Sequence, residues 1–220
     1  MESIKELIRT IVLKIQQEGL TDLKDPGTDL YWVPVAVVTR HVHLTSVHRE
    51  ILFGPGYRFT VHKDLQPGHF AARETLTVVG PKGSLKASII APDRSKTTLE
   101  ISRTDAYWLG VDPPNGNSGS LKGGKSVTLV GPRGSVTLTE GVYCALRHIH
   151  LPPQQTALLG LKGGDTVSVE VNGEKGLLMK NADIREGDFF PEMHIDTDEA
   201  NACDLKTGDR VRILKPLVER

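Results

Sequence analysis

Arg40-His41-Val42-His43-Leu44 recurs in nearly the same form as Arg147-His148-Ile149-His150-Leu151, and each copy follows apolar, strand-like sequence. Half of the chain's eight histidines lie in these two stretches. Side chains two residues apart on a β-strand point to the same face, so the two histidines of each copy share a face. Two imidazoles about 7 Å apart along a strand can bind one metal ion. Because the pattern occurs twice, it favours a paired metal site over histidines that only satisfy local hydrogen bonds.

The sequence from Tyr31 onward consists of short β-prone runs separated by Gly and Pro, without the long helices that a parallel sheet requires. Two internal repeats indicate duplicated strand-turn units. The repeats pair Val79-Gly80-Pro81-Lys82-Gly83-Ser84 with Val130-Gly131-Pro132-Arg133-Gly134-Ser135, and Leu161-Lys162-Gly163-Gly164-Asp165-Thr166-Val167 with Leu205-Lys206-Thr207-Gly208-Asp209-Arg210-Val211. The first pair is typical of hairpin turns, and the second of turns that lead into alternating strands. We therefore expect a mainly β protein built from small closed units, because closure removes exposed strand edges.

The first residues of the chain predict a different element. Apolar side chains recur there with helical spacing, and charged side chains lie between them. The apolar positions are Ile4, Leu7, Ile8, Ile11, Val12 and Ile15. Residues 3 to 18 are expected to form an amphipathic helix that ends before Gly19 and the turn at Asp25-Pro26-Gly27. Two interpretations stay open: the helix packs on the body of the protein, or it docks onto a partner.

Composition narrows the class of protein. The chain carries 27 basic and 27 acidic side chains, so no overall charge attracts nucleic acid or an anionic membrane. Its two cysteines, Cys144 and Cys203, lack both a disulfide framework and a zinc-type spacing. No apolar run approaches the roughly 20 residues that cross a bilayer, and the N-terminus lacks a secretion signal. We expect a cytoplasmic protein.

Two other kinds of catalytic motif are disfavoured. Residues from Gly119 to Ser126 have the spacing of a phosphate-binding loop, but a strand is predicted at Val127 to Val130 where that loop requires a helix. Cys144 and Cys203 have no histidine in an activating local motif, which argues against a cysteine nucleophile.

Further residues are candidates to complete a histidine site. His194 follows an apolar stretch and precedes an acidic turn, where Asp196 or Thr197 would cap a short helix. Glu100 ends an alternating run, in which a solvated carboxylate is an equally expected alternative. Arg94 lies in a Pro-Asp-Arg-Ser turn. The histidines expected to be exposed rather than ligating are His48, His62 and His69.

The sequence resembles the PduL-type phosphotransacylases, the phosphate propanoyltransferases of bacterial propanediol metabolism, which also include members that use acetyl-CoA. The likeness covers nearly the whole chain. Besides the two histidine stretches, its motifs are Val33-Pro34-Val35, Leu52-Phe53-Gly54-Pro55-Gly56-Tyr57, Asp64-Leu65-Gln66-Pro67-Gly68, Phe70-Ala71-Ala72-Arg73-Glu74-Thr75, Glu100-Ile101-Ser102-Arg103-Thr104-Asp105-Ala106 and the stretch from Glu192 to Asn201. The resemblance implies two small β-barrel domains with short capping helices, a zinc pair between them, and acyl transfer between coenzyme A and phosphate.

The same resemblance implies a domain division and a set of site residues. Residues 1–30 would form the N-terminal helix and linker, residues 31–38 with 146–220 the first barrel, and residues 39–145 the second barrel with an inserted hairpin near 53–72. His41, His43 and Glu100 would hold one zinc ion, His148, His150 and His194 would hold the other, and the catalytic residue Arg94 would bind phosphate. Cobalt, iron or nickel would suit the same ligands. The resemblance also implies a homodimer, and the N-terminal helix would direct the chain to the shell or cargo of a bacterial microcompartment.

The sequence departs from the family pattern near the ligands. Family members commonly have Ser-Asn where this chain has Val38-Thr39, Ser where it has Thr45, and Gln where it has His69. These changes concern hydrogen bonds around the ligands and the preference for acetyl or propanoyl groups, which the sequence leaves open.

The predicted reaction is direct attack of phosphate on the thioester, without an acyl-enzyme. Three protein ligands leave zinc an open position. The planar fork of an arginine can orient phosphate. Alternatives to Arg94 for this role are Arg40, Arg103 and Arg147. A zinc hydrolase would use the same ligands and would not require phosphate. A cupin oxygenase expects a glutamate near Val47 and His48, and an amidohydrolase requires a large barrel of alternating strands and helices. A non-enzymatic β-barrel module would bind no stoichiometric metal.

Overall fold

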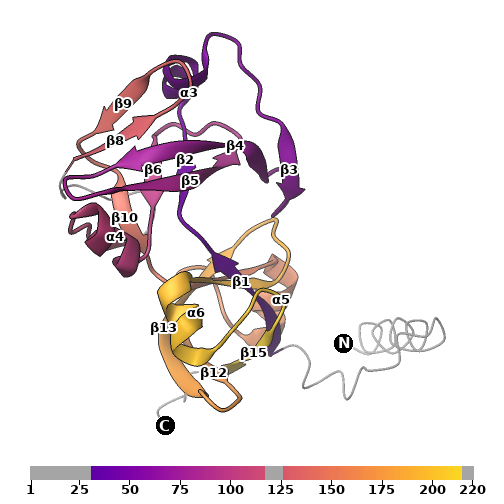
Figure 1. Ribbon diagram of the computed structural model, residues 1–220. Coiled ribbons are helices and arrows are strands. Elements are labelled where there is room, and N and C mark those ends of the chain that lie inside the picture. The colour runs from indigo at the N-terminus through magenta and orange to yellow at the C-terminus, as the bar shows by residue number, and fades with distance from the viewer. Residues whose placement is uncertain (1–30, 117–125, 215–220) are drawn as a thin grey trace.

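The computed structural model describes residues 31–116 and 126–214, which form a mainly β protein (Figure 1). The prediction of a mainly β fold is confirmed. The helix predicted at residues 3 to 18 lies outside the described residues. No helix in the described part of the chain is long and apolar enough to cross a membrane.

One group of strands closes into a six-stranded barrel in the order β1-β14-β11-β13-β12-β15. The strands are β1 (Trp32–Val38), β11 (His148–Leu151), β12 (Thr166–Val171), β13 (Leu177–Glu186), β14 (Glu192–Asp196) and β15 (Arg210–Leu214). Helix α5 (Pro153–Leu159) connects β11 to β12, and α6 (Thr197–Cys203) connects β14 to β15. Alternate strand residues such as Val33, Ile149 and Met193 are fully buried inside the barrel. Closure pairs every strand on both sides and so removes exposed edges.

The other strands form a nine-stranded sheet, referred to below as the sheet unit, in the order β7-β10-β6-β2-β5-β4-β8-β9, with β3 paired to β4. These strands are β2 (His41–His43), β3 (Val61–Asp64), β4 (Phe70–Val79), β5 (Ser84–Ala91), β6 (Thr98–Glu100), β7 (Asn115–Gly116), β8 (Val127–Val130), β9 (Ser135–Leu138) and β10 (Val142–Ala145). Its helices are α3 (Ser46–Phe53) and α4 (Arg103–Leu109). The expectation of two barrels therefore holds for one unit only. The repeats predict turns and strands, whereas closure depends on whether the two end strands meet, and β7 and β9 do not pair.

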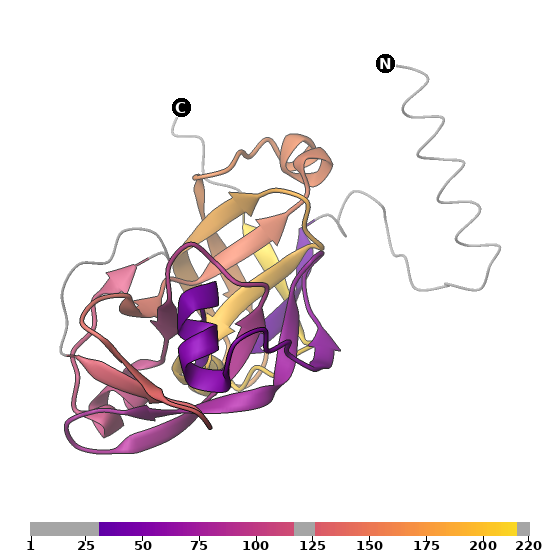
Figure 2. The same cartoon turned by 90° about the horizontal axis from the view of Figure 1, so that it is seen from above.

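The Gly-Pro-Lys/Arg-Gly repeats form equivalent hairpins between β4 and β5 and between β8 and β9, as predicted. In each turn, the N–H of the first glycine donates to the carbonyl of the last at 2.9 Å. A Cβ at Gly80 would lie 2.3 Å from the Leu109 carbonyl oxygen, and one at Gly131 would lie 2.5 Å from that of Leu52. Only glycine fits, because each hairpin packs against the end of a helix, as Figure 2 shows for α3 beside the β8-β9 hairpin.

The Gly-Asp repeats also form equivalent turns, and each leads into the predicted strand, β12 or β15. The carboxylate of Asp165 accepts a hydrogen bond from the Lys162 N–H at 2.9 Å, and Asp209 accepts one from the Lys206 N–H at 2.8 Å. Each aspartate thus closes its own turn before the strand begins.

Four strands, two in each unit, lead into helices with the same spacing. In each case, one apolar residue separates the last candidate ligand of the strand from the N-cap of the helix. The four pairs of candidate ligand and N-cap are His43 and Thr45, Glu100 and Ser102, His150 and Pro152, and His194 and Asp196. The Asp196 cap agrees with prediction: its carboxylate accepts from the Glu199 N–H at 2.8 Å. The helix starts therefore fix where these strands end.

Candidate metal centre

Strand register brings three predicted ligands together in each unit. In the sheet unit, β2 and β6 are antiparallel with His41 opposite Glu100. In the barrel, β11 and β14 are antiparallel with His148 opposite His194. Residues directly opposite each other in an antiparallel pair share a face, with Cβ atoms about 4.5–5.5 Å apart. Each His-x-His strand therefore meets a third candidate ligand on the neighbouring strand.

The barrel cluster consists of His148, His150 and His194. The distances between ring centroids are 4.9 Å for His148 and His150, 5.0 Å for His148 and His194, and 4.4 Å for His150 and His194. One ring nitrogen from each lies within 4.8 Å of the others. Within residues 31–116 and 126–214, no other group of three His, Cys, Asp or Glu side chains reaches this spacing.

The electrostatics of the barrel cluster suit a cation. Burial, with the positive charge of Arg185 as the next cause, lowers the pKa of His148 to about 2. Burial and neighbouring His194 lower the pKa of His150 to about 3. Both rings are therefore neutral at pH 7 and offer lone pairs. The pKa of Arg185, on β13, is itself lowered by burial.

The hydrogen bonds of the ring nitrogens show whether the barrel cluster could bind a metal ion. His148 Nδ1 donates to the Leu146 carbonyl at 2.9 Å, which leaves His148 Nε2 as the lone-pair nitrogen. His148 Nε2 and His150 Nδ1 are buried and have no hydrogen-bond partner among the residues that the structure describes. A buried polar atom left unpaired costs roughly 1–3 kcal/mol. Because a divalent ion would pair with such nitrogens, the cluster fits a metal site.

The sheet cluster consists of His41, His43 and Glu100. The two imidazole centroids lie 5.1 Å apart in a T-shaped arrangement, and His41 Nε2 lies 3.7 Å from Glu100 Oε2. His41 Nδ1 donates to the Thr39 carbonyl at 3.0 Å, which repeats the bond from His148 to the carbonyl two residues earlier. Burial, with lesser contributions from His41 and Arg94, lowers the pKa of His43 to about 2.

Glu100 is not the solvated carboxylate that the sequence allowed as an alternative. Its side chain is only 17% exposed, and Tyr143 Oη on β10 donates to Glu100 Oε2 at 3.0 Å. That alternative is wrong because β6 is an interior strand between β10 and β2. Burial and the nearby Glu100 raise the pKa of Tyr143, so the phenol keeps its proton and remains a donor.

Arg94, the predicted phosphate-binding residue, lies near the sheet cluster. Arg94 lies in the connection between β5 and β6, where its backbone N–H donates to the Leu44 carbonyl at 2.7 Å. Arg94 is exposed to solvent, and partial desolvation by surrounding atoms still lowers the pKa of its guanidinium group. The positive charge of Arg94 contributes to the lowered pKa of His43, and Arg94 interacts electrostatically with Glu100. Among the described residues, no carboxylate lies within ion-pair distance of Arg94.

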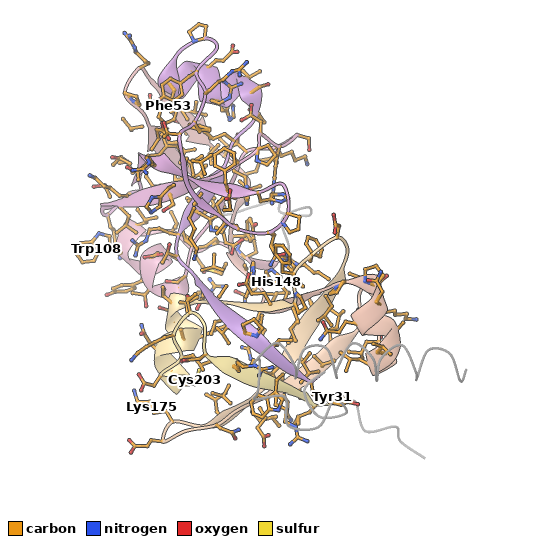
Figure 3. All side chains as sticks on the ribbon, turned by 90° about the vertical axis from the view of Figure 1, so that its right-hand side faces the viewer. Tyr31, Phe53, Trp108, His148, Lys175 and Cys203 are labelled. Atoms are coloured by element: carbon orange, nitrogen blue, oxygen red, sulfur yellow. The ribbon has the colours of Figure 1, made fainter. Side chains whose placement is uncertain are left out.

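The two clusters border a common space. A small cavity is lined by Glu100 from the sheet unit and by His148 and His194 from the barrel. Arg185 on the barrel interacts with Glu100 as well as with the barrel histidines. Figure 3 shows His148 where the two units meet. The structure therefore places Glu100 of the sheet cluster beside the barrel cluster, and Arg94 interacts electrostatically with both Glu100 and Arg185.

Several residues at this boundary were not predicted from the sequence as site residues: Tyr143, Arg185, Gln66 and Glu192. Glu192 lies two residues before His194 and therefore on the same strand face, a signal that alternation provides. Tyr143 and Arg185 reach the boundary through tertiary contacts and carry no local motif. Gln66 belongs to one of the family motifs, but that motif does not indicate its contact with Glu192. Of the histidines expected to be exposed, His62 is exposed, but His48 and His69 are half-buried. His69 interacts electrostatically with both His43 and His150, so it lies near both clusters.

The two cysteines are poor nucleophiles. Both thiols are buried. Burial raises the pKa of Cys144 to about 11, and it also raises the pKa of Cys203. Since the thiolate is the reactive form, neither side chain is activated at neutral pH.

The barrel, the sheet unit and the histidine clusters at their boundary define a mainly β protein with a candidate metal site. The family model for phosphate propanoyltransferase matches residues 34–206. The chain is 44% identical over 220 residues to the phosphate propanoyltransferase of Rhodopseudomonas palustris, and the match covers 97% of both chains. It is 45% identical over 214 residues to that of Lachnoclostridium phytofermentans (95% of this chain, 97% of the relative) and 43% identical over 203 residues to that of Salmonella typhimurium (90% and 92%).

The chain belongs to the phosphate propanoyltransferase family. The predicted family is therefore confirmed, and so is the prediction that the chain is an enzyme of the acyltransferase class.

Proposed function

We propose that this enzyme transfers a propanoyl or acetyl group reversibly between coenzyme A and inorganic phosphate. Family membership supports acyl-CoA and phosphate as the substrates. The observation that carries the proposal at the level of the site is the meeting of two ligand clusters and Arg94 at one boundary. The relatives named as propanoyltransferases favour the propanoyl group. An acetyl group differs from it by one methylene, worth only about 1–3 kcal/mol of discrimination.

The proposed cofactors are two divalent ions, with zinc as the first choice. His148, His150 and His194 would hold one, and His41, His43 and Glu100 would hold the other. Such an ion supplies, when bound, polarisation of the thioester carbonyl and a lower pKa for the coenzyme A thiol. The imidazoles and the carboxylate make a donor set that zinc accepts, and cobalt, iron and nickel accept it as well.

The proposed chemistry is a direct displacement. A phosphate oxygen attacks the thioester carbonyl carbon, the carbon–sulfur bond breaks, and the electron pair leaves with the sulfur of coenzyme A. Arg94 would bind and orient phosphate through its planar fork of donors, and it remains charged at neutral pH. The buried, protonated thiols of Cys144 and Cys203 support a mechanism without an acyl-enzyme.

The same proposal includes the predicted organisation of the chain. Residues 1–30 would precede a barrel domain of residues 31–38 and 146–220 and a second domain of residues 39–145. A homodimer, a cytoplasmic location and targeting to a microcompartment through the N-terminal helix stay predictions. Deletion of residues 1–18 with unchanged localisation would contradict the targeting role.

The proposed function is tested by measuring release of free thiol from propanoyl-CoA and acetyl-CoA, with and without phosphate, using enzyme of known metal content. We expect release that requires phosphate, yields acyl phosphate and is lost in His148→Ala. His62→Ala is the matched control, because His62 is exposed on β3. Thiol release without phosphate would identify a hydrolase instead, and full activity without any metal would contradict the metal-dependent mechanism.

A further inference from the structure

Gln66 is a buried side chain of the sheet unit that makes its side-chain hydrogen bonds to the barrel. It lies in the turn between β3 and β4 and is 7% exposed. Its Oε1 accepts from the Phe190 N–H at 2.8 Å, and its Nε2 donates to the Phe190 carbonyl at 3.3 Å. The amide thus pairs with both backbone groups of one residue, which fixes the segment before β14. In Figure 1, β3 descends from the sheet unit toward this part of the barrel.

The same amide reaches a histidine of the barrel cluster through one carboxylate. Gln66 Nε2 donates to Glu192 Oε2 at 3.1 Å, and His194 Nε2 lies 2.8 Å from that oxygen. An ionised carboxylate only accepts, so His194 Nε2 carries the hydrogen. In the neutral ring, His194 Nδ1 then keeps the lone pair that a metal ion requires. The three side chains form a continuous chain from the sheet unit to the barrel cluster.

A second contact of the segment before β14 reaches the cluster. The Phe189 ring stacks on His150 with centroids 4.3 Å apart and an interplanar angle of 13°. The segment that Gln66 holds therefore touches two of the three histidines, one by stacking and one through Glu192. The Gln66 turn is itself closed, since the His69 N–H donates to the Gln66 carbonyl at 2.9 Å.

We propose that Gln66 is a positioning residue for the barrel metal centre, acting through Glu192 on the tautomer and orientation of His194. The inference rests on the proposed function, because it assigns the histidine cluster a metal ion. An amide suits this role, since it offers an acceptor to the Phe190 N–H and donors to the carboxylate. The sheet unit thereby completes a site whose three ligands all belong to the barrel. The sheet cluster, by contrast, is supported within its own unit through Tyr143 and Glu100.

The test compares metal affinity in full-length wild-type enzyme and in Gln66→Leu, measured by competition with a chromophoric chelator for zinc and for cobalt. Partners that hydrogen-bond to metal ligands are worth about 10- to 100-fold in metal affinity. We expect Gln66→Leu to weaken one of the two metal equivalents by that factor and to leave the other unchanged. The visible spectrum of cobalt at the weakened site should change as well. Gln154→Leu, an exposed glutamine on α5, is the matched control.

A second variant keeps the test decisive if leucine disturbs folding. Gln66→Glu retains the acceptor for the Phe190 N–H but removes the donors and places a negative charge against Glu192, so it should weaken the same metal equivalent. Wild-type affinity at both sites in a folded Gln66 variant would overturn the positioning role, even if the acyl transfer activity fell. Absence of metal binding by active wild-type enzyme would instead overturn the metal-dependent function, and this inference with it.

Discussion

The barrel cluster and the sheet cluster are built by the same strand pairing but differ in their third member. In both, a His-x-His strand lies antiparallel to a strand whose candidate ligand stands opposite the first histidine. The barrel supplies a third histidine, and the three rings lie close together. The sheet unit supplies Glu100, which Tyr143 holds by a hydrogen bond. Register therefore decides which residues meet, and the third side chain and its partners decide the chemistry of the site.

The two clusters also differ in charge and support. The barrel cluster is an all-nitrogen donor set, whereas the sheet cluster includes a carboxylate, which harder divalent ions accept more readily. The barrel cluster is bridged to the other unit through Gln66, and the sheet cluster is supported internally. We therefore expect the two metal equivalents to be separable by substitution and by choice of metal.

The largest effect is expected from removing a ligand in each cluster. His148→Ala and His41→Ala should each lose one metal equivalent and lower kcat/KM by more than about 100-fold, since even partners of ligands are worth 10- to 100-fold. Metal analysis beside steady-state kinetics checks this prediction. If either variant kept two metal equivalents, its cluster would not be a metal site.

A smaller effect is expected from Arg94, which lies on the sheet side of the boundary. Arg94→Met should raise the KM for phosphate by roughly 10- to 100-fold, because hydrogen bonds to charged groups contribute about 1.5–3 kcal/mol. The KM for acyl-CoA should change far less. Arg94→Lys keeps the charge without the planar fork and should recover part of the loss. Arg58→Met, at an exposed position, is the control, and an unchanged phosphate KM in Arg94→Met would refute the assignment.

Tyr143→Phe should affect the sheet cluster alone. The substitution removes the hydroxyl that donates a hydrogen bond to Glu100. The half-buried carboxylate of Glu100 then loses the partner that holds it in the orientation needed to bind a metal ion. We expect about a tenfold loss of affinity for one metal equivalent, the lower limit for a partner of a ligand. The weakened equivalent should be the one that Gln66→Leu leaves intact. If the two variants weakened the same equivalent, the clusters would not be independently supported.

Local sequence was sufficient for the parts of this protein that depend on local geometry. The repeated hairpin turns and the Asp196 helix cap lie as predicted, because turn formation and capping are properties of short segments. The need for glycine at Gly80 and Gly131 comes instead from the close approach of a helix end, which is a tertiary contact. Alternation along a strand likewise predicted that each pair of histidines shares a face. The division between one closed and one open sheet was not predictable from the repeats, since it depends on which distant edges pair.

The site residues divide in the same way. The histidines carry a local pattern, but the register that sets Glu100 opposite His41 is a tertiary property. Gln66 is separated from Glu192 by more than half of the chain and carries no sign of their contact in sequence alone. Only a resemblance to a family, which encodes tertiary constraints indirectly, could indicate Glu100 and Arg94 before the structure.

The smallest effect is the contribution of single histidines to the pH dependence of stability in metal-free enzyme. Burial lowers the pKa of His43 and of His148 to about 2 and that of His150 to about 3, whereas an unfolded histidine has a pKa of about 6.5. Below pH 6.5 the unfolded chain therefore binds protons that the native state does not bind, and the free energy of unfolding decreases as the pH falls. Between pH 7 and pH 6 each such histidine should remove about 0.7 kcal/mol from the free energy of unfolding. Two of them lie in the barrel and one in the sheet unit. Urea unfolding at both pH values should show a smaller loss in His43→Gln than in wild-type, and a smaller loss again in His148→Gln/His150→Gln. A pH dependence unchanged by these substitutions would mean that the native clusters take up protons as readily as the unfolded chain.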